Sequence, residues 1–180
     1  LVVSLSPMTG VPIDSNVGGH FGPLLKMSGW DALEITGKSE KPVILYIDGD
    51  NGKVSVFEDF IEAVDSHLIC EDLTDHFGKV HEKKHHVAVI CTGRAGKTSP
   101  MAMLNFSMYD IPRKGVRMKQ AGRGGIGMVL EDKNIKAIVV RTSKPIGNFN
   151  DPADEKTLNE LGQRVHKECL KLDRGYLNMR

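Results

Sequence analysis

Short apolar runs separated by turns that carry glycine or proline dominate the first 145 residues, a pattern typical of β-strands. Residues 43–47 and 53–57 flank the turn Asp48-Gly49-Asp50-Asn51-Gly52, which predicts a β-hairpin. Residues 87–90 and 136–141 are largely apolar and predict two buried strands. The opening run, residues 1–5, and the alternating residues 30–36 predict two more strands.

Helical spacing of apolar residues occurs in three segments. Residues 21–28 form a short stripe with Pro23 in the first turn, and residues 60–76 predict a longer helix that Gly78 can end. A final helix is predicted from Asp151, as its cap, and Pro152, with an apolar stripe of Leu158, Leu161, Val165 and Leu172. Hairpin strands mixed with a few helices, without βαβ alternation, predict an α+β fold class.

Composition and charge narrow the classes of function. The chain has 180 residues, with 24 Lys and Arg against 23 Asp and Glu, so its net charge of +1 predicts no bulk attraction to nucleic acid or to a membrane. No apolar run reaches the roughly 18 residues of a membrane-spanning helix, and we expect a cytoplasmic protein. Three cysteines without a Cys-x-x-Cys pair predict reduced thiols rather than a disulfide framework or a metal cage.

Two glycine-bearing segments could bind an anion. Residues 91–98, Cys-Thr-Gly-Arg-Ala-Gly-Lys-Thr, approach the phosphate-binding pattern G-x-x-x-x-G-K-[ST], but Cys91 replaces its first glycine. Residues 14–23 form a glycine-bearing turn that leads into the start of a helix, where free N–H groups favour an anion. A plain capping turn would have the same composition, so both interpretations of residues 14–23 stay open.

Residues 116–130 give the clearest indication of a ligand-binding segment. Glycines at positions 122, 124, 125 and 127 would allow a ligand to approach the backbone closely. From residue 111 to residue 130 there is no acidic residue, and there are five cations: Arg113, Lys114, Arg117, Lys119 and Arg123. Arginine side chains and free backbone N–H groups together suit a polyanionic ligand. The alternative is a flexible, exposed basic loop.

This segment also carries a family resemblance. Residues 121–127, Ala-Gly-Arg-Gly-Gly-Ile-Gly, followed by residues 131–140, resemble a signature in the N-terminal domain of the aldehyde ferredoxin oxidoreductase family. Residues 2–10, 16–22 and 37–43 also follow the pattern of that family, in the same order. The resemblance covers residues 1 to about 144.

The resemblance implies a fold, a cofactor and a reaction. Members of this family hold tungsten or molybdenum between two pterins beside a [4Fe-4S] cluster, and oxidise aldehydes to carboxylic acids with ferredoxin as acceptor. Their N-terminal domain is a β-rich saddle that carries the pterins, and Mg²⁺ joins the two pterin phosphates. By resemblance the cofactor-binding residues are Asn16, Gly18, Lys119, Gln120, Gly122 and Arg123. The backbone carbonyls of Asn16 and Gln120 would face the Mg²⁺.

The same resemblance sets the domain organisation. Residues 1–144 would be the pterin-binding domain, and residues 145–180 a linker and amphipathic helix leading to domains outside this chain. The cluster ligands and the catalytic acid and base would lie there, since none of the three cysteines has the spacing of cluster ligands. We therefore expect a fragment or a separate subunit, inactive alone, whose partners are the remaining domains or subunits and ferredoxin, with a homodimer as a further assembly.

Departures from the family pattern leave two alternatives open. Lys119-Gln120 stands where the family usually has Arg-Ala, and Gly96-Lys97 replaces a Gly-Glu pair, which makes residues 91–98 a variant of a family loop. The first alternative is a cofactor-free structural or interaction module. The second is a nucleotide binder that uses the loop at Lys97.

Overall fold

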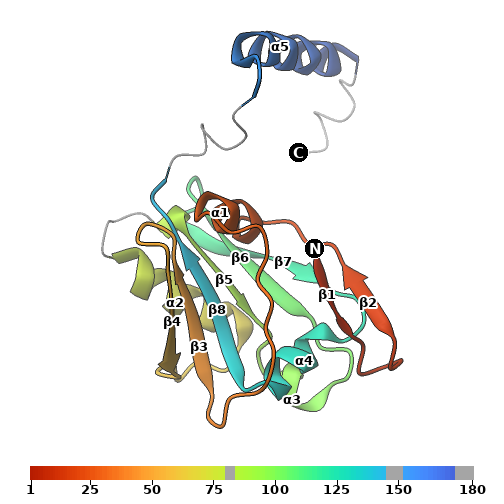
Figure 1. Cartoon of the computed structure of the whole chain (residues 1–180), viewed down its shortest axis with the longest axis vertical. Helices are drawn as coiled ribbons and strands as arrows, with labels where there is room; N and C mark the ends of the chain where they lie inside the picture. The colour runs from red at the N-terminus through yellow and green to blue at the C-terminus, as the bar shows by residue number, and fades with distance from the viewer. Residues whose placement is uncertain (80–83, 145–151, 173–180) are drawn as a thin grey trace. The chain divides into compact units, whose positions relative to one another are not determined.

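The computed structural model describes residues 1–79, 84–144 and 152–172. Contacts divide the chain into two compact units, Leu1–Pro145 and Ile146–Arg180. A six-stranded sheet forms the centre of the first unit (Figure 1). Its strand order is β4 (Lys53–Glu58), β3 (Val43–Asp48), β8 (Ile135–Arg141), β5 (Val87–Cys91), β6 (Leu104–Asp110) and β7 (Gly115–Ala121). Strands β3 and β8 are parallel, and all other neighbours are antiparallel.

One face of the sheet packs against helix α2 (Ser66–Gly78). Ile69, Cys70 and Leu73 of this helix lie against Val89 and Val139 of the central strands, and all five residues are buried. Every residue of β5 is buried, because this strand lies at the centre of a sheet covered on both faces.

The other face is covered by shorter elements. These are α1 (Phe21–Met27), a two-stranded sheet of β1 (Val2–Leu5) and β2 (Pro12–Ser15), and α4 (Ile126–Asp132). Figure 1 shows α1 near the end of the sheet where β3 and β8 finish, and α4 with the four-residue helix α3 (Ala95–Thr98) near the opposite end. A short 3₁₀ helix, η2 (Lys84–His86), leads into β5.

The mixed sheet and its helices confirm the predicted α+β class. The hairpin of residues 43–58 and helix α1 lie where the sequence predicts them, as do strands β1, β5 and β8. Strands β2, β6 and β7 and helices α3 and α4 were not anticipated. In particular, residues 116–130 are not one glycine-rich loop, since β7 and α4 account for all but residues 122–125.

Two predictions for the first unit are wrong. Residues 30–36 form no strand; they cross the face of the sheet, where Ile35 packs on the core, and pair with no strand. The long helix begins at Ser66 rather than near residue 60. The side chain of Asp59 accepts a 3.0 Å hydrogen bond from Ile61 N, and Ile61 and Ala63 both pack on the core, so this stretch has the two-residue period of extended chain.

In the second unit, helix α5 spans Glu155–Leu172. The predicted start at Asp151 and Pro152 is wrong for Pro152, which precedes the helix, and Asp151 lies outside the described residues. Asp154 occupies the capping position, since its carboxylate accepts hydrogen bonds of 2.9 Å from Thr157 N and 2.7 Å from Thr157 Oγ1. Within the described part of the chain no helix is both long and apolar enough to cross a membrane.

Candidate functional site

Two of the glycine-bearing segments meet in the fold. The backbone N–H of Arg123 donates a 3.3 Å hydrogen bond to Ser15 Oγ, across 108 positions of sequence. A Cβ built on Gly18 would lie 3.7 Å from Lys119 Cγ, and one built on Gly124 would lie 3.0 Å from Ile13 Cδ1. The structure therefore brings the predicted residues Asn16 and Gly18 to the same place as the segment from Lys119 to Arg123, which we call the two-loop site.

Close packing around the second loop leaves no room for side chains at several of its glycines. Gly124 and Gly125 have φ angles of +68° and +69°, which side chains rarely adopt. A Cβ on Gly125 would overlap the carbonyl of Pro100, and one on Gly127 would lie 2.5 Å from Met103 O. Gly127 N also donates a 2.9 Å hydrogen bond to Ala102 O. This loop is held against residues 100–103, which does not match the alternative of a free basic loop.

Lys119 and Gln120 project to opposite faces of the sheet. Lys119 pairs with Phe106 of β6, on the face that carries the loop of residues 16–19. The side chain of Gln120 lies on the other face, where its Nε2 donates a 3.4 Å hydrogen bond to Asn105 Oδ1. A ligand in the two-loop site can therefore be contacted by the Lys119 side chain, and by Gln120 only through its backbone.

Positive charge at the site comes from two of the five cations. Asp110 pairs with Arg113 at 3.1 Å and with Arg117 at 3.3 Å. Desolvation raises the pKa of Asp110, but hydrogen bonds from Arg113 and Arg117 outweigh it and hold that pKa below its usual value. Lys119 and Arg123 are exposed and make no ion pair with any residue that the structure describes. Lys119 and Arg123 therefore leave uncompensated charge where the two loops meet. Lys114, which also makes no ion pair within the described residues, lies in the turn between β6 and β7 instead.

A cavity of about 660 Å³ lies beside the first loop, and Gly18 in its wall is close to the Lys119 side chain. Its wall includes Gly18 and Gly19 of the first loop and mostly apolar side chains, with Phe21, Trp30 and Phe106 among them. The charged residues of the wall are Lys26, Asp31, Glu34 and Lys133. An apolar hollow beside exposed cations suits a flat ring system that carries phosphate groups. Trp30 was missed at the sequence level, because residues 30–36 suggested a strand rather than a cavity wall.

Residues 91–98 do not form a phosphate cradle. Cys91 is buried within β5, and helix α3 has only four residues. Lys97 Nζ lies 3.5 Å from Glu131 Oε1, and Arg94 Nε lies 3.1 Å from Asp65 Oδ1, so both cations of the loop already have partners. A Cβ on Gly96 would lie 2.9 Å from Glu131 Cβ, so the absence of a side chain at Gly96 allows α3 to pack closely against α4. The interpretation as a nucleotide binder gains no support.

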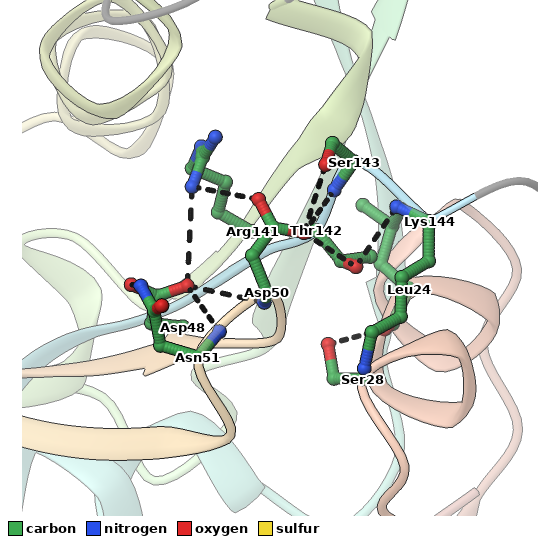
Figure 2. A network of polar contacts seen from close by, with 9 residues as sticks. All are labelled: Leu24, Ser28, Asp48, Asp50, Asn51, Arg141, Thr142, Ser143 and Lys144. Atoms are coloured by element: carbon green, nitrogen blue, oxygen red, sulfur yellow. Dashed lines mark hydrogen bonds and ion pairs between the residues drawn. The ribbon is translucent and has the colours of Figure 1, made fainter.

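A second polar cluster lies at the ends of the parallel strands β3 and β8 (Figure 2). The guanidinium of Arg141 is 3.1 Å from Asp50 Oδ2 and 3.9 Å from Asp48 Oδ1, and its side chain is only 10 % exposed. Asp50 Oδ1 accepts hydrogen bonds from Ser143 N at 2.7 Å and from Ser143 Oγ at 2.9 Å. Desolvation acts to raise the pKa of Asp50, yet these bonds and the Arg141 charge hold it below its usual value. This Arg141 cluster had no signal in the sequence.

The described residues contain no group of three or more His, Cys, Asp or Glu side chains that could hold a metal ion. A hard cation such as Mg²⁺ at the two-loop site would therefore depend on backbone carbonyls and on oxygen atoms of the ligand itself. The backbone carbonyls of Asn16 and Gln120 match that requirement in chemical type, and neither needs its side chain for the purpose.

The α+β domain thus combines a glycine-bearing site that carries exposed cations with a neighbouring, mostly apolar cavity. The family model "Aldehyde ferredoxin oxidoreductase, N-terminal domain" matches residues 1–142. The chain therefore belongs to the aldehyde ferredoxin oxidoreductase family, an oxidoreductase family, and contains its N-terminal domain.

Relatives and a solved structure agree with this assignment. The chain is 35 % identical over 161 residues to a tungsten-containing aldehyde ferredoxin oxidoreductase of Pyrococcus horikoshii, covering 87 % of this chain and 24 % of the relative. It is 37 % identical over 150 residues to the enzyme of that name from Thermococcus kodakarensis, covering 81 % and 22 %. The active-site complex BamBC of benzoyl coenzyme A reductase matches with a TM-score of 0.60 and 29 % identity, over 79 % of this chain and 19 % of that one. The chain thus spans about a quarter of the length of the curated relatives that it matches.

Proposed function

We propose that this chain is the cofactor-binding part of an aldehyde ferredoxin oxidoreductase-like enzyme that uses a tungsten or molybdenum bis-pterin. Residues 1–144 form the binding domain, and residues 145–180 lead to the rest of the enzyme. When bound, the cofactor supplies the two-electron redox chemistry that converts an aldehyde to a carboxylic acid. This chain binds and orients it and compensates its phosphate charge, and it has no complete active site of its own.

The observation that carries the proposal is the convergence of two distant loops on unpaired cations. Asn16 and Gly18 come from the first loop, and Lys119, Gln120, Gly122 and Arg123 come from the second. Gly18 and Gly122 are exposed glycines, so a ligand meets backbone rather than side chain at these positions. Lys119 and Arg123 are the donors for phosphate oxygens, and the adjoining apolar cavity accommodates a ring system.

The remaining parts of the proposal concern groups outside this chain. The backbone carbonyls of Asn16 and Gln120 would bind Mg²⁺, which would compensate part of the charge of the pterin phosphates. The [4Fe-4S] cluster would be bound by the other domains or subunits, which also receive ferredoxin, and the assembled enzyme could be a homodimer in the cytoplasm. The named relatives are tungsten-containing enzymes, which favours tungsten over molybdenum.

The proposal is tested by metal retention in the complete enzyme that contains this chain. We expect Arg123→Ala to lower tungsten or molybdenum occupancy by about ten-fold or more after dialysis, because a hydrogen bond to a charged group contributes roughly 1.5–3 kcal/mol. Occupancy is measured by elemental analysis, with pterin and phosphorus in parallel. Arg113→Ala is the matched control, since Arg113 is exposed but already paired with Asp110.

Metal content of the native assembly separates the proposal from the alternative of a cofactor-free structural module. Tungsten or molybdenum together with iron supports a cofactor-binding part. Neither metal in a native preparation, or equal occupancy in the Arg123→Ala and Arg113→Ala proteins, would contradict the proposed role of the two-loop site.

A further inference from the structure

Two buried cysteines lie side by side away from the two-loop site. Cys70 is on α2 and Cys91 ends β5, and each is 0 % exposed. Their Sγ atoms are 3.6 Å apart, and Cys91 Sγ is also 3.6 Å from the carbonyl oxygen of Ser66. The helix and the strand pack against each other over much of their length, so this pairing is fixed by the fold.

We propose that Cys70 and Cys91 are a redox-active pair that a small two-electron oxidant such as hydrogen peroxide converts to a disulfide, fastening α2 to β5. In this reaction two S–H bonds and the O–O bond break, while one S–S bond and two O–H bonds form. The sulfur atoms lose two electrons to the peroxide, which leaves as two water molecules. An S–S bond is about 2.05 Å long, so the sulfur atoms must approach by roughly 1.5 Å.

Both cysteines are closed off from solvent, so an oxidant reaches them only when the structure around α2 opens. A cavity of about 310 Å³ lies close to the pair in sequence. It is lined by Ile69, which precedes Cys70, by Gly93, two positions after Cys91, and by Lys136. The charge of Lys136 acts to lower the pKa of Cys91, but the hydrogen bond with Cys70 and burial prevail and raise that pKa well above its usual value. The Cys91 thiol is therefore protonated at neutral pH, and the buried pair reacts slowly, in step with opening of the structure around α2.

Disulfide formation would have a measurable structural effect. The bond would close a loop of 21 positions and restrict the unfolded chain, which stabilises the folded form. It would also hold the start of α2, where Asp65 pairs with Arg94 and where Gly93 packs against Ser66. The oxidised protein should therefore unfold at a temperature several degrees higher than the reduced protein.

The experiment uses the full chain with Cys169→Ser, because Cys169 is exposed and would exchange with other thiols. The reduced protein is treated with hydrogen peroxide, unfolded, labelled with N-ethylmaleimide and weighed by mass spectrometry. We expect the label to fall from two per chain to none, a peptide that joins Cys70 to Cys91, and recovery of both labels after reduction.

The matched control carries Cys70→Ala together with Cys169→Ser. Its single buried thiol at Cys91 should retain its label under the same treatment, and peroxide should not raise its unfolding temperature. Two labels per chain after exposure to hydrogen peroxide for many times the interval over which the structure around α2 opens, as measured by amide hydrogen exchange, would overturn the proposal. Sulfinic acid at either cysteine, or disulfides only between chains, would overturn it as well.

Discussion

The Arg141 cluster and the two-loop site show two opposite uses of charge in one domain. Arg141 is buried between Asp48 and Asp50. Asp50 also accepts hydrogen bonds from the backbone N–H and the hydroxyl group of Ser143. Lys119 and Arg123 are exposed, and the described residues provide no carboxylate for either. The charges of the first cluster are paired within the protein, whereas the second site has donors without partners.

The glycines of the two sites differ in the same way as their charged groups. Gly49 lies in the Arg141 cluster, where a Cβ would overlap Ser28 and Thr142, so the cluster is closed by its own atoms. Gly18 lies in the two-loop site with only Lys119 Cγ near its missing side chain, at 3.7 Å. Charged groups closed in by protein maintain the fold, and charged groups beside open backbone are available for binding. Substitutions should separate these two roles.

The largest effect is expected from Arg141→Met. This change keeps much of the volume of the side chain but leaves Asp48 and Asp50 without a cation, which should lower the free energy of unfolding by about 3 kcal/mol. Urea denaturation measures it. Arg113→Met removes an exposed cation from Asp110 and should cost less than about 1 kcal/mol. Equal losses in the two variants would show that burial of Arg141 has no energetic consequence.

A smaller effect is expected from acid. The pKa of Asp50 in the folded protein lies below its usual value of 3.8, so the contribution of this carboxylate to stability is fully present above that value and is lost as pH falls through the folded pKa. Asp50→Asn should therefore be less stable than the parent protein at neutral pH, and the two should converge below about pH 4. Unfolding curves recorded from pH 7 to pH 3 test this, and curves that stay parallel would contradict it.

The sequence predicted those elements whose pattern is local. The hairpin of residues 43–58 has alternating strands and a glycine turn, and both signals lie within a few positions of each other. Strand β7 was missed because it is an edge strand: Arg117 and Lys119 project from one face, and only Val116 and Met118 on the other face pack on the core. The positive charge of this segment suggested a loop, although apolar and charged residues alternate along it as they do in a strand.

The candidate site was predicted in composition but not in geometry. Glycines and cations marked both loops, yet nothing local indicated that Ser15 and Arg123 would share a hydrogen bond. The role of Gly125 was equally hidden, because the carbonyl that excludes a side chain there belongs to Pro100. The Arg141 cluster is the extreme case, since it joins residues 93 positions apart and no periodic pattern specifies them.

The smallest effect on stability is expected at the two-loop site. Lys119→Ala and Arg123→Ala should each change the free energy of unfolding of this chain by less than about 0.5 kcal/mol, because both side chains are exposed and neither loses an ion pair. Urea denaturation measures this beside Arg141→Met. A loss above about 1 kcal/mol in either variant would place that cation among the groups that maintain the fold. It would also remove the electrostatic argument for a phosphate-bearing ligand, since an unpaired cation has no folding role to lose.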